Sequence, residues 1–263
     1  MTRPLYLGGE ARQVCLDGPA LRVATSLSPL DARVPLRLVS RITSRQGTEW
    51  STEALARCLT LGVPVTFVST DGDPVGYCVP ARQRAVNLSR LLAAFENDVR
   101  SIGAFGDWAR AEERRAILDL LRRHPRMMPA RDLRPAFLRA AFLAAAGEDQ
   151  PWATAVLRRL EGLLAAHMVQ LLKDAGVGMP WVAPAPDRQA DVFGACARAA
   201  GWLLLPALSR VLAHRRRHPR AWRRAGDGQR RVARAYEAVG PAVAAATSRR
   251  LRRLEIWLWD RRQ

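Results

Sequence analysis

The spacing of apolar residues changes once along this chain, near Arg82. Before it, short runs rich in β-branched residues are broken by Gly, Asp and Pro, a pattern typical of strands and turns. After it, apolar residues recur at the three- and four-residue spacing of amphipathic helices. The sequence therefore predicts an α+β chain, with an N-terminal β domain over residues 1–82 and a larger, basic, all-α domain over residues 83–263.

The stretch STEALARCLTLGVPVTFVSTDGDPVGY, residues 51–77, predicts the one short helix of the β domain and two strands after it. Ser51 or Thr52 is a suitable N-cap, and Glu53 places a carboxylate in the first turn, where the helix dipole favours it. Gly62 and Pro64 then end the helix. The β-branched run and the Asp-Gly turn that follow predict the last two strands of the domain.

Positive charge is concentrated in the second part of the chain. The chain carries 42 Lys and Arg against 24 Asp and Glu, a net charge of +18, but its first 80 residues contribute only +1. Lys173 is the only lysine, so the other cations are arginine, which suits bidentate contacts to phosphate. This asymmetry points to a polyanionic partner, most often nucleic acid, with an anionic membrane surface as the rival.

The four cysteines show neither a CxxC pair nor zinc-ligand spacing, so reduced thiols in a cytosolic protein are expected. The N-terminus lacks the apolar core of a signal peptide. No uncharged apolar run approaches the roughly 18 residues that suggest a membrane span. We therefore expect a soluble, cytoplasmic protein with no membrane partner.

Arginine is densest in the stretch SRVLAHRRRHPRAWRRAGDGQRRVAR, residues 209–234. Arginine recurs there every one to three residues with few acids beside it, which favours salt-dependent binding to the phosphate backbone of DNA. The competing interpretation is a solvated charged face. Trp222 suits either stacking on a base or packing beneath the arginine side chains. The predicted DNA-binding residues are Arg215, Arg216, Arg217, Arg220, Arg223, Arg224, Arg230 and Arg231.

Three elements of the β part resemble the spacer-acquisition endonuclease and integrase family of CRISPR systems. They are PLYLGG at residues 4–9, VPLRLVSRI at 34–42 before the helix that opens with STEAL, and GVPVTFVSTDGDPVGY at 62–77. In the helical part the resemblance depends on LLAAHMVQLLKDAGVG and the later DVF. The resemblance implies that the β domain forms dimers and that the helical domain holds DNA.

Members of that family bind a divalent metal through a Glu, a His and an Asp, and the metal activates the oxygen that attacks the phosphodiester. Carried over to this chain, the Asp falls at Asp191. Trp181 occupies the region of the His, and Ala136 or Phe137 the region where Glu-Gly followed by small residues and an aromatic is expected. Because a hard cation needs several oxygen ligands, one surviving carboxylate predicts no bound metal. Mg²⁺ or Mn²⁺ is the cofactor if a working site exists.

Two further side chains are candidate metal ligands. His167 shares a helical face with Leu160 and Leu164, so a buried, hydrogen-bonded histidine is favoured over a ligand. Glu161 is a second carboxylate that folding could bring toward Asp191.

For two further pairs of residues, a structural role is the default interpretation. Glu148 and Asp149, beside Gly147, are expected in a solvated loop or a helix cap. Trp257 and Trp259, near the end of the chain, are expected in the core or at a partner interface.

Three hypotheses for function follow. The favoured one is a catalytically degraded member of the integrase family that binds double-stranded or branched DNA in CRISPR adaptation. The second is an active metal-dependent DNA endonuclease or integrase with displaced ligands, and the third is an unrelated basic helical nucleic-acid-binding protein. The resemblance also implies a homodimer, or a heterodimer with an active family paralogue, and a small ferredoxin-like adaptation protein as a further partner.

Overall fold

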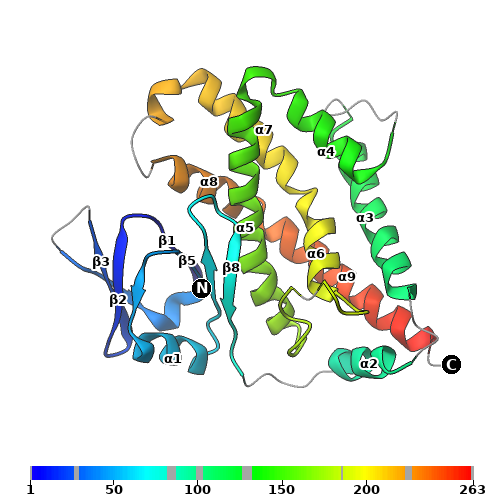
Figure 1. Ribbon diagram of the computed structural model, residues 1–263, viewed down its shortest axis with the longest axis horizontal. Helices are drawn as coiled ribbons and strands as arrows, with labels where there is room; N and C mark the ends of the chain where they lie inside the picture. Colours follow the sequence, from blue (N-terminus) through cyan, green and yellow to red (C-terminus); the bar gives the residue numbers. More distant parts are fainter. Residues whose placement is uncertain are drawn as a thin grey trace.

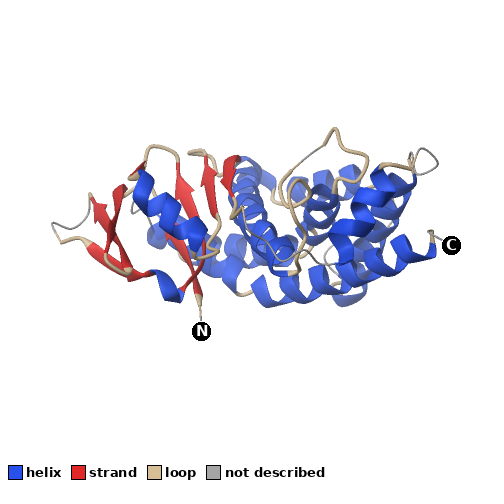
Figure 2. Ribbon diagram, turned by 90° about the horizontal axis from the view of Figure 1, so that it is seen from below, coloured by secondary structure: helices blue, strands red, loops and turns tan. Residues whose placement is uncertain are grey.

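Strands and helices lie at opposite ends of an elongated molecule (Figures 1 and 2). The computed structural model describes residues 2–26, 30–81, 87–98, 103–125, 132–184, 186–222 and 227–261. The last strand ends at Cys78, and the described residues beyond it contain helices and turns but no strand. This confirms the predicted α+β class, while the predicted boundary at residue 82 lies outside the described residues.

The sheet nearer the helices has four strands in the order β1–β5–β7–β8. β1 (Arg3–Leu7) and β7 (Val65–Val68) both run parallel to β5 (Val39–Arg45), and β8 (Pro74–Cys78) pairs antiparallel with β7. Ile42 and Val65 are fully buried on this sheet. Parallel strands with both faces covered are rich in β-branched residues, as these are.

The outer sheet has the order β4–β3–β2–β6. β3 (Ala20–Thr25) pairs antiparallel with β2 (Ala11–Asp17) and with β4 (Ala32–Pro35), and β6 (Glu49–Trp50) runs parallel to β2. The segment VPLRLVSRITS has a strand-like composition throughout, but the 3₁₀ turn Leu36–Leu38 divides it between β4 and β5. Leu36 is buried in the core of the β part, which fixes this turn in place.

Helix α1 (Thr52–Thr60) forms as the sequence predicts. The Oγ of Ser51 accepts the N–H of Ala54 at 3.2 Å, which caps the helix, and Gly62 takes the positive φ that follows its end. Ala54 and Cys58 are buried against the strands. All four cysteines are free, as expected.

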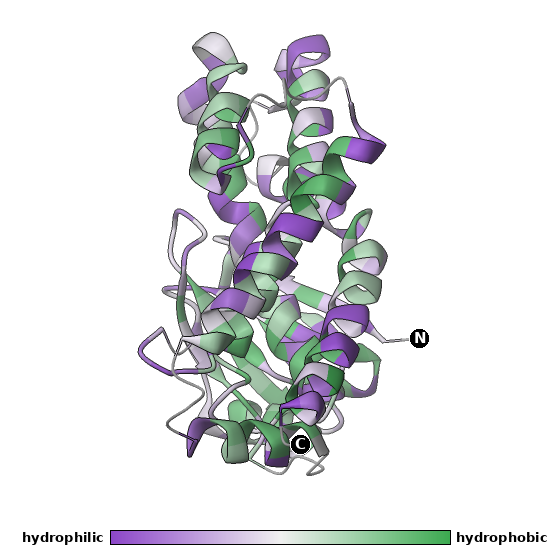
Figure 3. Ribbon diagram, turned by 90° about the vertical axis from the view of Figure 1, so that its right-hand side faces the viewer, coloured by the Kyte–Doolittle hydropathy of each residue, from purple (hydrophilic) through white to green (hydrophobic). Residues whose placement is uncertain are grey.

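The helical part is built around α5 (Gln150–Asp174), which packs against the β5–β7–β8 side of the sheet and against most of the other helices (Figure 1). Those helices carry both hydrophilic and hydrophobic segments along their length, as amphipathic helices do (Figure 3). They are α2 (Asn87–Glu96), α3 (Ala104–Arg123), α4 (Pro135–Ala144), α6 (Val192–Gly201), α7 (Leu204–Arg217), α8 (Asp227–Glu237) and α9 (Gly240–Asp260), with 3₁₀ turns η3 (Gly147–Asp149) and η4 (Pro219–Trp222).

One apolar stretch of the helical part is divided by a bend. The stretch after Ala190 forms α6 and α7, which are bent by 43° at Trp202 and Leu203. Trp202 is almost completely buried and donates its indole N–H to Glu113 at 3.1 Å, which holds the bend. Near the C-terminus, Trp257 is partly buried and packs against the core through the rings of Phe95 and Trp108, whereas Trp259 is 46% exposed.

A polar network joins the two parts of the molecule. The buried guanidinium of Arg41 donates to Gln170 of α5 at 3.1 Å and lies 3.0 Å from the carboxylate of Glu237 on α8. Tyr6 hydrogen-bonds with both Arg41 and Glu237. The only lysine, Lys173, donates to the carbonyl of Gly62 at 2.8 Å.

No single helix in the described ranges is both long and apolar enough to cross a membrane. The bent pair α6 and α7 reaches that threshold together, by length and composition alone.

Candidate nucleic-acid interface and expected metal site

Asp191 is the N-cap of α6. Its Oδ1 accepts the N–H of Gly194 at 2.8 Å, and its Oδ2 lies 3.4 Å from Nη1 of Arg198. The side chain is only 16% exposed. Both carboxylate oxygens are therefore used within the first turns of the helix that Asp191 begins, and capping is a sufficient reason for an aspartate here.

A hollow of about 280 Å³ lies beside Asp191, against α3. Arg110, Arg188 and Arg198 line it together with the carboxylates of Asp191 and Glu113. Each of these arginines is ion-paired, Arg110 with Asp107, Arg188 with Glu96 and Arg198 with Asp191. The guanidinium groups of the hollow are thus already neutralised by acidic partners, and they restrict the access of a metal cation to Asp191.

The other two expected positions do not supply ligands next to Asp191. Trp181 is buried, and the guanidinium of Arg188 lies 5.7 Å from its ring centre. Phe137 is 47% exposed on α4, and no described residue of α4 lines the hollow. Aromatic and aliphatic side chains at these positions cannot coordinate a hard cation.

Glu161, on α5, is a second carboxylate that shares a feature with the family's pattern. Glu161 and Gly162 form the one Glu-Gly pair in the chain, and Ala165 and Ala166 follow, so they match the Glu-Gly part of the family pattern better than Ala136 or Phe137 does. The glycine also has a structural cause, because a Cβ at Gly162 would lie 1.9 Å from the carbonyl oxygen of Gly72. The Glu-Gly pair makes Glu161 a candidate for the family's glutamate, and this assignment stays a prediction.

Arginine also occupies the surroundings of Glu161. Its Oε1 lies 3.1 Å from Nη1 of Arg139, which itself stacks over the ring of Trp202. Burial raises the pKa of Glu161, the positive charge of Arg139 opposes that rise, and the negative charge of Asp73 adds to it, so that the net pKa is raised. Glu161 and Asp191 have different partners, from α4 and from α6 respectively.

The residues present do not fit a divalent metal. No group of three His, Cys, Asp or Glu side chains that could hold a metal ion occurs within the described ranges. Glu161 and Asp191 each have an arginine at hydrogen-bond or ion-pair distance. A guanidinium beside a carboxylate occupies the same oxygen atoms that a cation needs, and its charge repels the ion.

His167 is a structural histidine, as predicted. It is 7% exposed, and its Nδ1 lies 2.9 Å from the hydroxyl of Tyr236, which is fully buried. Burial, with a contribution from the charge of Arg41, lowers the pKa of His167 to about 3. The imidazole is therefore neutral at physiological pH and is held within the helical core.

Two of the predicted DNA-binding arginines have partners inside the protein. Arg215 and Arg216 each place a guanidinium nitrogen 3.0 Å from the carboxylate of Asp149, and Arg215 also stacks over Trp152 at 4.3 Å. Asp149 stands at the N-cap position of α5, as predicted, but its side chain makes no capping hydrogen bond and pairs with these two arginines instead. The side chain of Glu148 lies outside the described residues.

The remaining arginines of this run differ in whether they have a partner within the protein. Arg217 and Arg220 are exposed and have no ion-pair partner among the described residues. Arg230 lies 3.8 Å from Glu10, and Arg231 stacks over the ring of Trp222 at 5.7 Å. Arg223 and Arg224 lie outside the described residues.

Trp222 packs beneath this basic surface rather than projecting from it. Its indole N–H donates to Nδ1 of His214 at 3.1 Å, and its ring meets that of Trp152 edge to face. Of the two roles open to Trp222 on the sequence, the structure shows packing under the arginine side chains.

The sequence profile of the family described as CRISPR associated protein Cas1 matches residues 5–174. The chain belongs to the Cas1 family. The hypothesis of an unrelated basic helical protein is therefore wrong, and the resemblance found in the sequence is confirmed. At the level of its family, the chain is an integrase-type protein of CRISPR adaptation.

Solved Cas1 structures share the fold. A Cas1 protein from Thermotoga maritima matches with a TM-score of 0.75 at 13% identity, over 97% of each chain. A TtCas1–DNA complex matches with a TM-score of 0.50 at 16% identity, over 95% of this chain and 96% of that one. A Cas6-RT-Cas1–Cas2 complex matches with a TM-score of 0.55 at 14% identity, over 92% of this chain and 35% of that one. No curated protein matches the chain.

Proposed function

We propose that this Cas1-family chain serves in spacer acquisition as a DNA-binding subunit that lacks a metal-dependent site of its own. One observation carries the proposal: both candidate carboxylates are paired with arginine, Glu161 with Arg139 and Asp191 with Arg198. Strand cleavage and joining require a metal held by several ligands, and such pairs oppose its binding. The same arginines favour phosphate.

DNA is the proposed partner of the basic helical surface. Arg217 and Arg220 are exposed at the end of α7 and on η4, free of acids among the described residues. Exposed guanidinium groups bind backbone phosphates with little dependence on base sequence. The solved complex of the related TtCas1 contains DNA, which supports this assignment.

The proposed assembly is a homodimer, or a heterodimer with an active Cas1 paralogue, formed through the β domain in the cytoplasm. A paralogue would supply the metal sites that this chain lacks. The proposed second partner is a small ferredoxin-like adaptation protein, and a related solved complex contains Cas1 with Cas2. Sedimentation of the purified chain at micromolar concentration, alone and with these proteins, tests the assembly. A monomer under every condition contradicts it.

The second candidate function is an active metal-dependent endonuclease or integrase, with Mg²⁺ or Mn²⁺ at displaced ligands. One observation favours it: the β7–β8 loop that carries Asp73 contacts α5 beside Glu161, since a Cβ at Gly162 would lie 1.9 Å from the carbonyl oxygen of Gly72, and the charge of Asp73 adds to the raised pKa of Glu161. A pair of carboxylates is the beginning of a metal site, although Arg139 competes for Glu161.

One experiment separates these functions. The purified chain is incubated with branched and linear DNA in Mg²⁺ or Mn²⁺, beside Asp191→Ala, Glu161→Gln and, as a matched control, Asp187→Asn at an exposed position. We expect DNA to be bound and neither cut nor joined by any of the four proteins. Cleavage or joining that is lost in Glu161→Gln or Asp191→Ala, and kept in the control, would establish the second function.

A further inference from the structure

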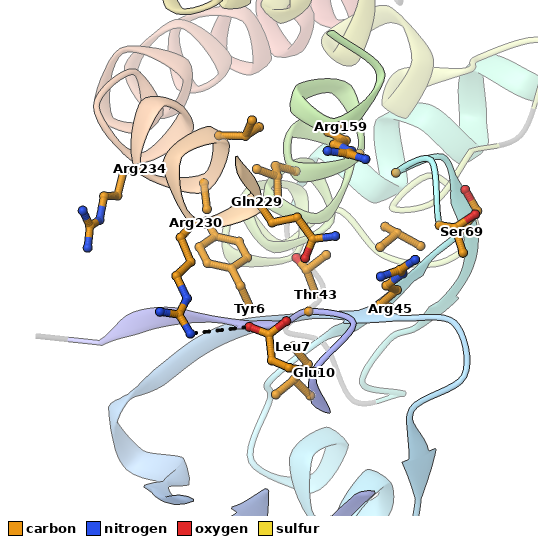
Figure 4. A pocket seen from close by; sticks show the side chains of 18 of the residues that line it. Tyr6, Leu7, Glu10, Thr43, Arg45, Ser69, Arg159, Gln229, Arg230 and Arg234 are labelled. Carbon is orange, nitrogen blue, oxygen red and sulfur yellow. Dashed lines mark ion pairs between the residues drawn. The ribbon is translucent and has the colours of Figure 1, made fainter. Parts of the chain in front are cut away.

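A cavity of about 380 Å³ lies where the inner sheet meets α5 and α8 (Figure 4). Its walls come from β1 and the Gly8–Gly9 turn, from β5, from the end of β7 and the loop that follows it, and from the two helices. Cavities of about 300–1,000 Å³ are typical of sites for small organic ligands. This cavity is separate from the hollow beside Asp191, with which it shares no lining residue.

Glycines set the shape of the cavity. A Cβ at Gly9 would lie 2.0 Å from Nη1 of Arg45, so the guanidinium rests directly on the backbone of the turn. Gly72 has a φ of +100°, and a Cβ there would lie 2.7 Å from Cα of Arg159. The same loop meets α5 at Gly162. The strand loops and α5 are thus in backbone contact around the cavity, which makes it a built feature of the fold.

Two arginines face the cavity without an acidic partner. Arg45 and Arg159 line it and form no ion pair with any described residue, and the Nε of Arg159 is buried with no hydrogen-bond partner. The acids nearby are already engaged, Glu10 with Arg230 and Glu237 with Arg41. Figure 4 shows Arg45 and Arg159 on the same side of Gln229, whereas Arg234 points outward. Two unpaired guanidinium groups beside one hollow favour an anionic ligand.

A buried hydroxyl in the cavity wall also has no partner. Thr43 is 5% exposed, lines the cavity, and its Oγ1 has no hydrogen-bond partner in the described part of the chain. A buried hydroxyl without a partner costs folding free energy, so such groups in native proteins call for an explanation. Ser69 and Gln229 add polar groups at the same edge, while Leu163 and Val232 form an apolar wall.

We propose that this cavity binds a nucleoside phosphate. The phosphate lies between Arg45 and Arg159, where each guanidinium donates charge-assisted hydrogen bonds, and the hydroxyl of Thr43 supplies a further donor. The cavity is larger than a phosphate group needs, and its apolar wall accommodates the nucleoside. The ligand is either a free mononucleotide or the phosphorylated 5′ end of a DNA strand. The site is independent of the exposed arginines Arg217 and Arg220 proposed for DNA.

Calorimetric titration of the full chain tests the proposal. The probes are thymidine monophosphate, thymidine, inorganic phosphate, and a short single strand with or without a 5′ phosphate. The variants are Arg159→Gln and Arg45→Gln. The matched control is Arg158→Gln, which makes the same change at an exposed neighbour on the same helix and outside the cavity lining.

We expect thymidine monophosphate to bind more tightly than thymidine or inorganic phosphate. Loss of one charge-assisted contact should weaken it about tenfold or more in Arg159→Gln and Arg45→Gln, and less than about twofold in the control. If only the 5′-phosphorylated strand binds with this variant pattern, the strand end is the ligand. If no probe binds, if binding is equal in wild type and Arg159→Gln, or if inorganic phosphate binds as tightly as the nucleotide, the proposal is overturned.

Thr43→Val provides a second test that does not depend on the arginines. Because its hydroxyl has no partner, replacing it with a methyl group of the same shape should leave the melting temperature unchanged or raise it. The same variant should weaken nucleotide binding several-fold. A Thr43→Val protein that binds the nucleotide as wild type does would contradict the assigned role of this hydroxyl.

Discussion

Arg41 on β5 and Glu237 at the end of α8 form an ion pair at 3.0 Å across 196 residues of sequence. Arg41 is buried and also donates to Gln170 of α5, so one strand residue is tied to two helices. This places the polar contact between the β part and the helical part beside the proposed nucleotide cavity, since Glu237 lines that cavity.

Glu237→Gln should lower the free energy of unfolding by about 1–3 kcal/mol, because a buried guanidinium loses a charged acceptor. The effect is smaller than for a fully buried pair, since Glu237 is 41% exposed. Urea unfolding measures it, with the exposed Glu49→Gln as the control. A loss equal to that of the control would show that the pair contributes nothing to stability.

Gly162→Ala should be strongly destabilising. The new Cβ would lie 1.9 Å from the backbone oxygen of Gly72, so α5 and the β7–β8 loop must separate. Overpacking of this kind typically costs about 1–3 kcal/mol, and a clash with backbone falls at the upper end. Gly76→Ala is the matched control, because nothing lies within 4 Å of its Cβ position. Equal melting temperatures for the two variants would contradict the close approach.

The buried imidazole of His167 should make the stability of the fold depend on pH. Burial lowers its pKa to about 3 from an ordinary value of 6.5, so below pH 6.5 the unfolded chain binds a proton that the folded chain does not. The free energy of unfolding should therefore fall as the pH is lowered from about 6.5 to about 3, by at most about 1.4 kcal/mol per unit from this group. Above about pH 6.5 the imidazole is neutral in both the folded and the unfolded chain, so the free energy of unfolding is not reduced by this group.

Urea unfolding at pH 7 and pH 4.5 checks this dependence. The double variant His167→Phe with Tyr236→Phe removes both hydrogen-bonding partners, and its stability should fall by about 2–3 kcal/mol less between these pH values than that of wild type. His218→Gln, at an exposed histidine, should behave as wild type. Identical acid losses in the double variant and wild type would contradict a buried neutral imidazole.

The class of fold was predictable because each part of the chain has its own period of apolar residues, and local signals such as the Ser51 cap were read correctly. The division between β4 and β5 was not predictable from the sequence. Leu36 and its neighbours have a strand-like composition, and only burial in the tertiary core selects a turn there. The bend at Trp202 depends in the same way on a hydrogen bond to Glu113, which lies 89 residues away.

The site residues were harder to predict than the fold. The pairing of Asp149 with Arg215 joins positions 66 residues apart, and nothing local in the sequence indicates it. The cavity that contains Arg45, Arg159 and Thr43 is assembled from three strands, a loop and two helices, and only the folded chain shows that these arginines have no acidic partner among the described residues. Glu161 can be named as a candidate from the sequence alone, because its Glu-Gly pair is a local signal.

DNA affinity should depend on the exposed arginines and little on the paired ones. Arg217→Gln with Arg220→Gln should weaken binding to any duplex to a similar degree and reduce the slope of log affinity against log salt by about one unit for each lost phosphate contact. Arg216→Gln should mainly lower the melting temperature, because it breaks the pair with Asp149. Unchanged affinity in the double variant would make this run a solvated face.

Asp191 should behave as a helix cap. Asp191→Ala removes the acceptor for the N–H of Gly194 and should cost about 1 kcal/mol, whereas Asp191→Asn keeps a capping oxygen and should recover most of that loss. The pair with Arg198, at 51% exposure of the guanidinium, adds little. Thermal unfolding with and without millimolar Mg²⁺ or Mn²⁺ distinguishes a cap from a ligand. If Asp191 acts only as a cap, the ion should leave the melting temperature unchanged, both in wild type and in Asp191→Asn. A rise in wild type that disappears in Asp191→Asn would show that this carboxylate binds a metal after all.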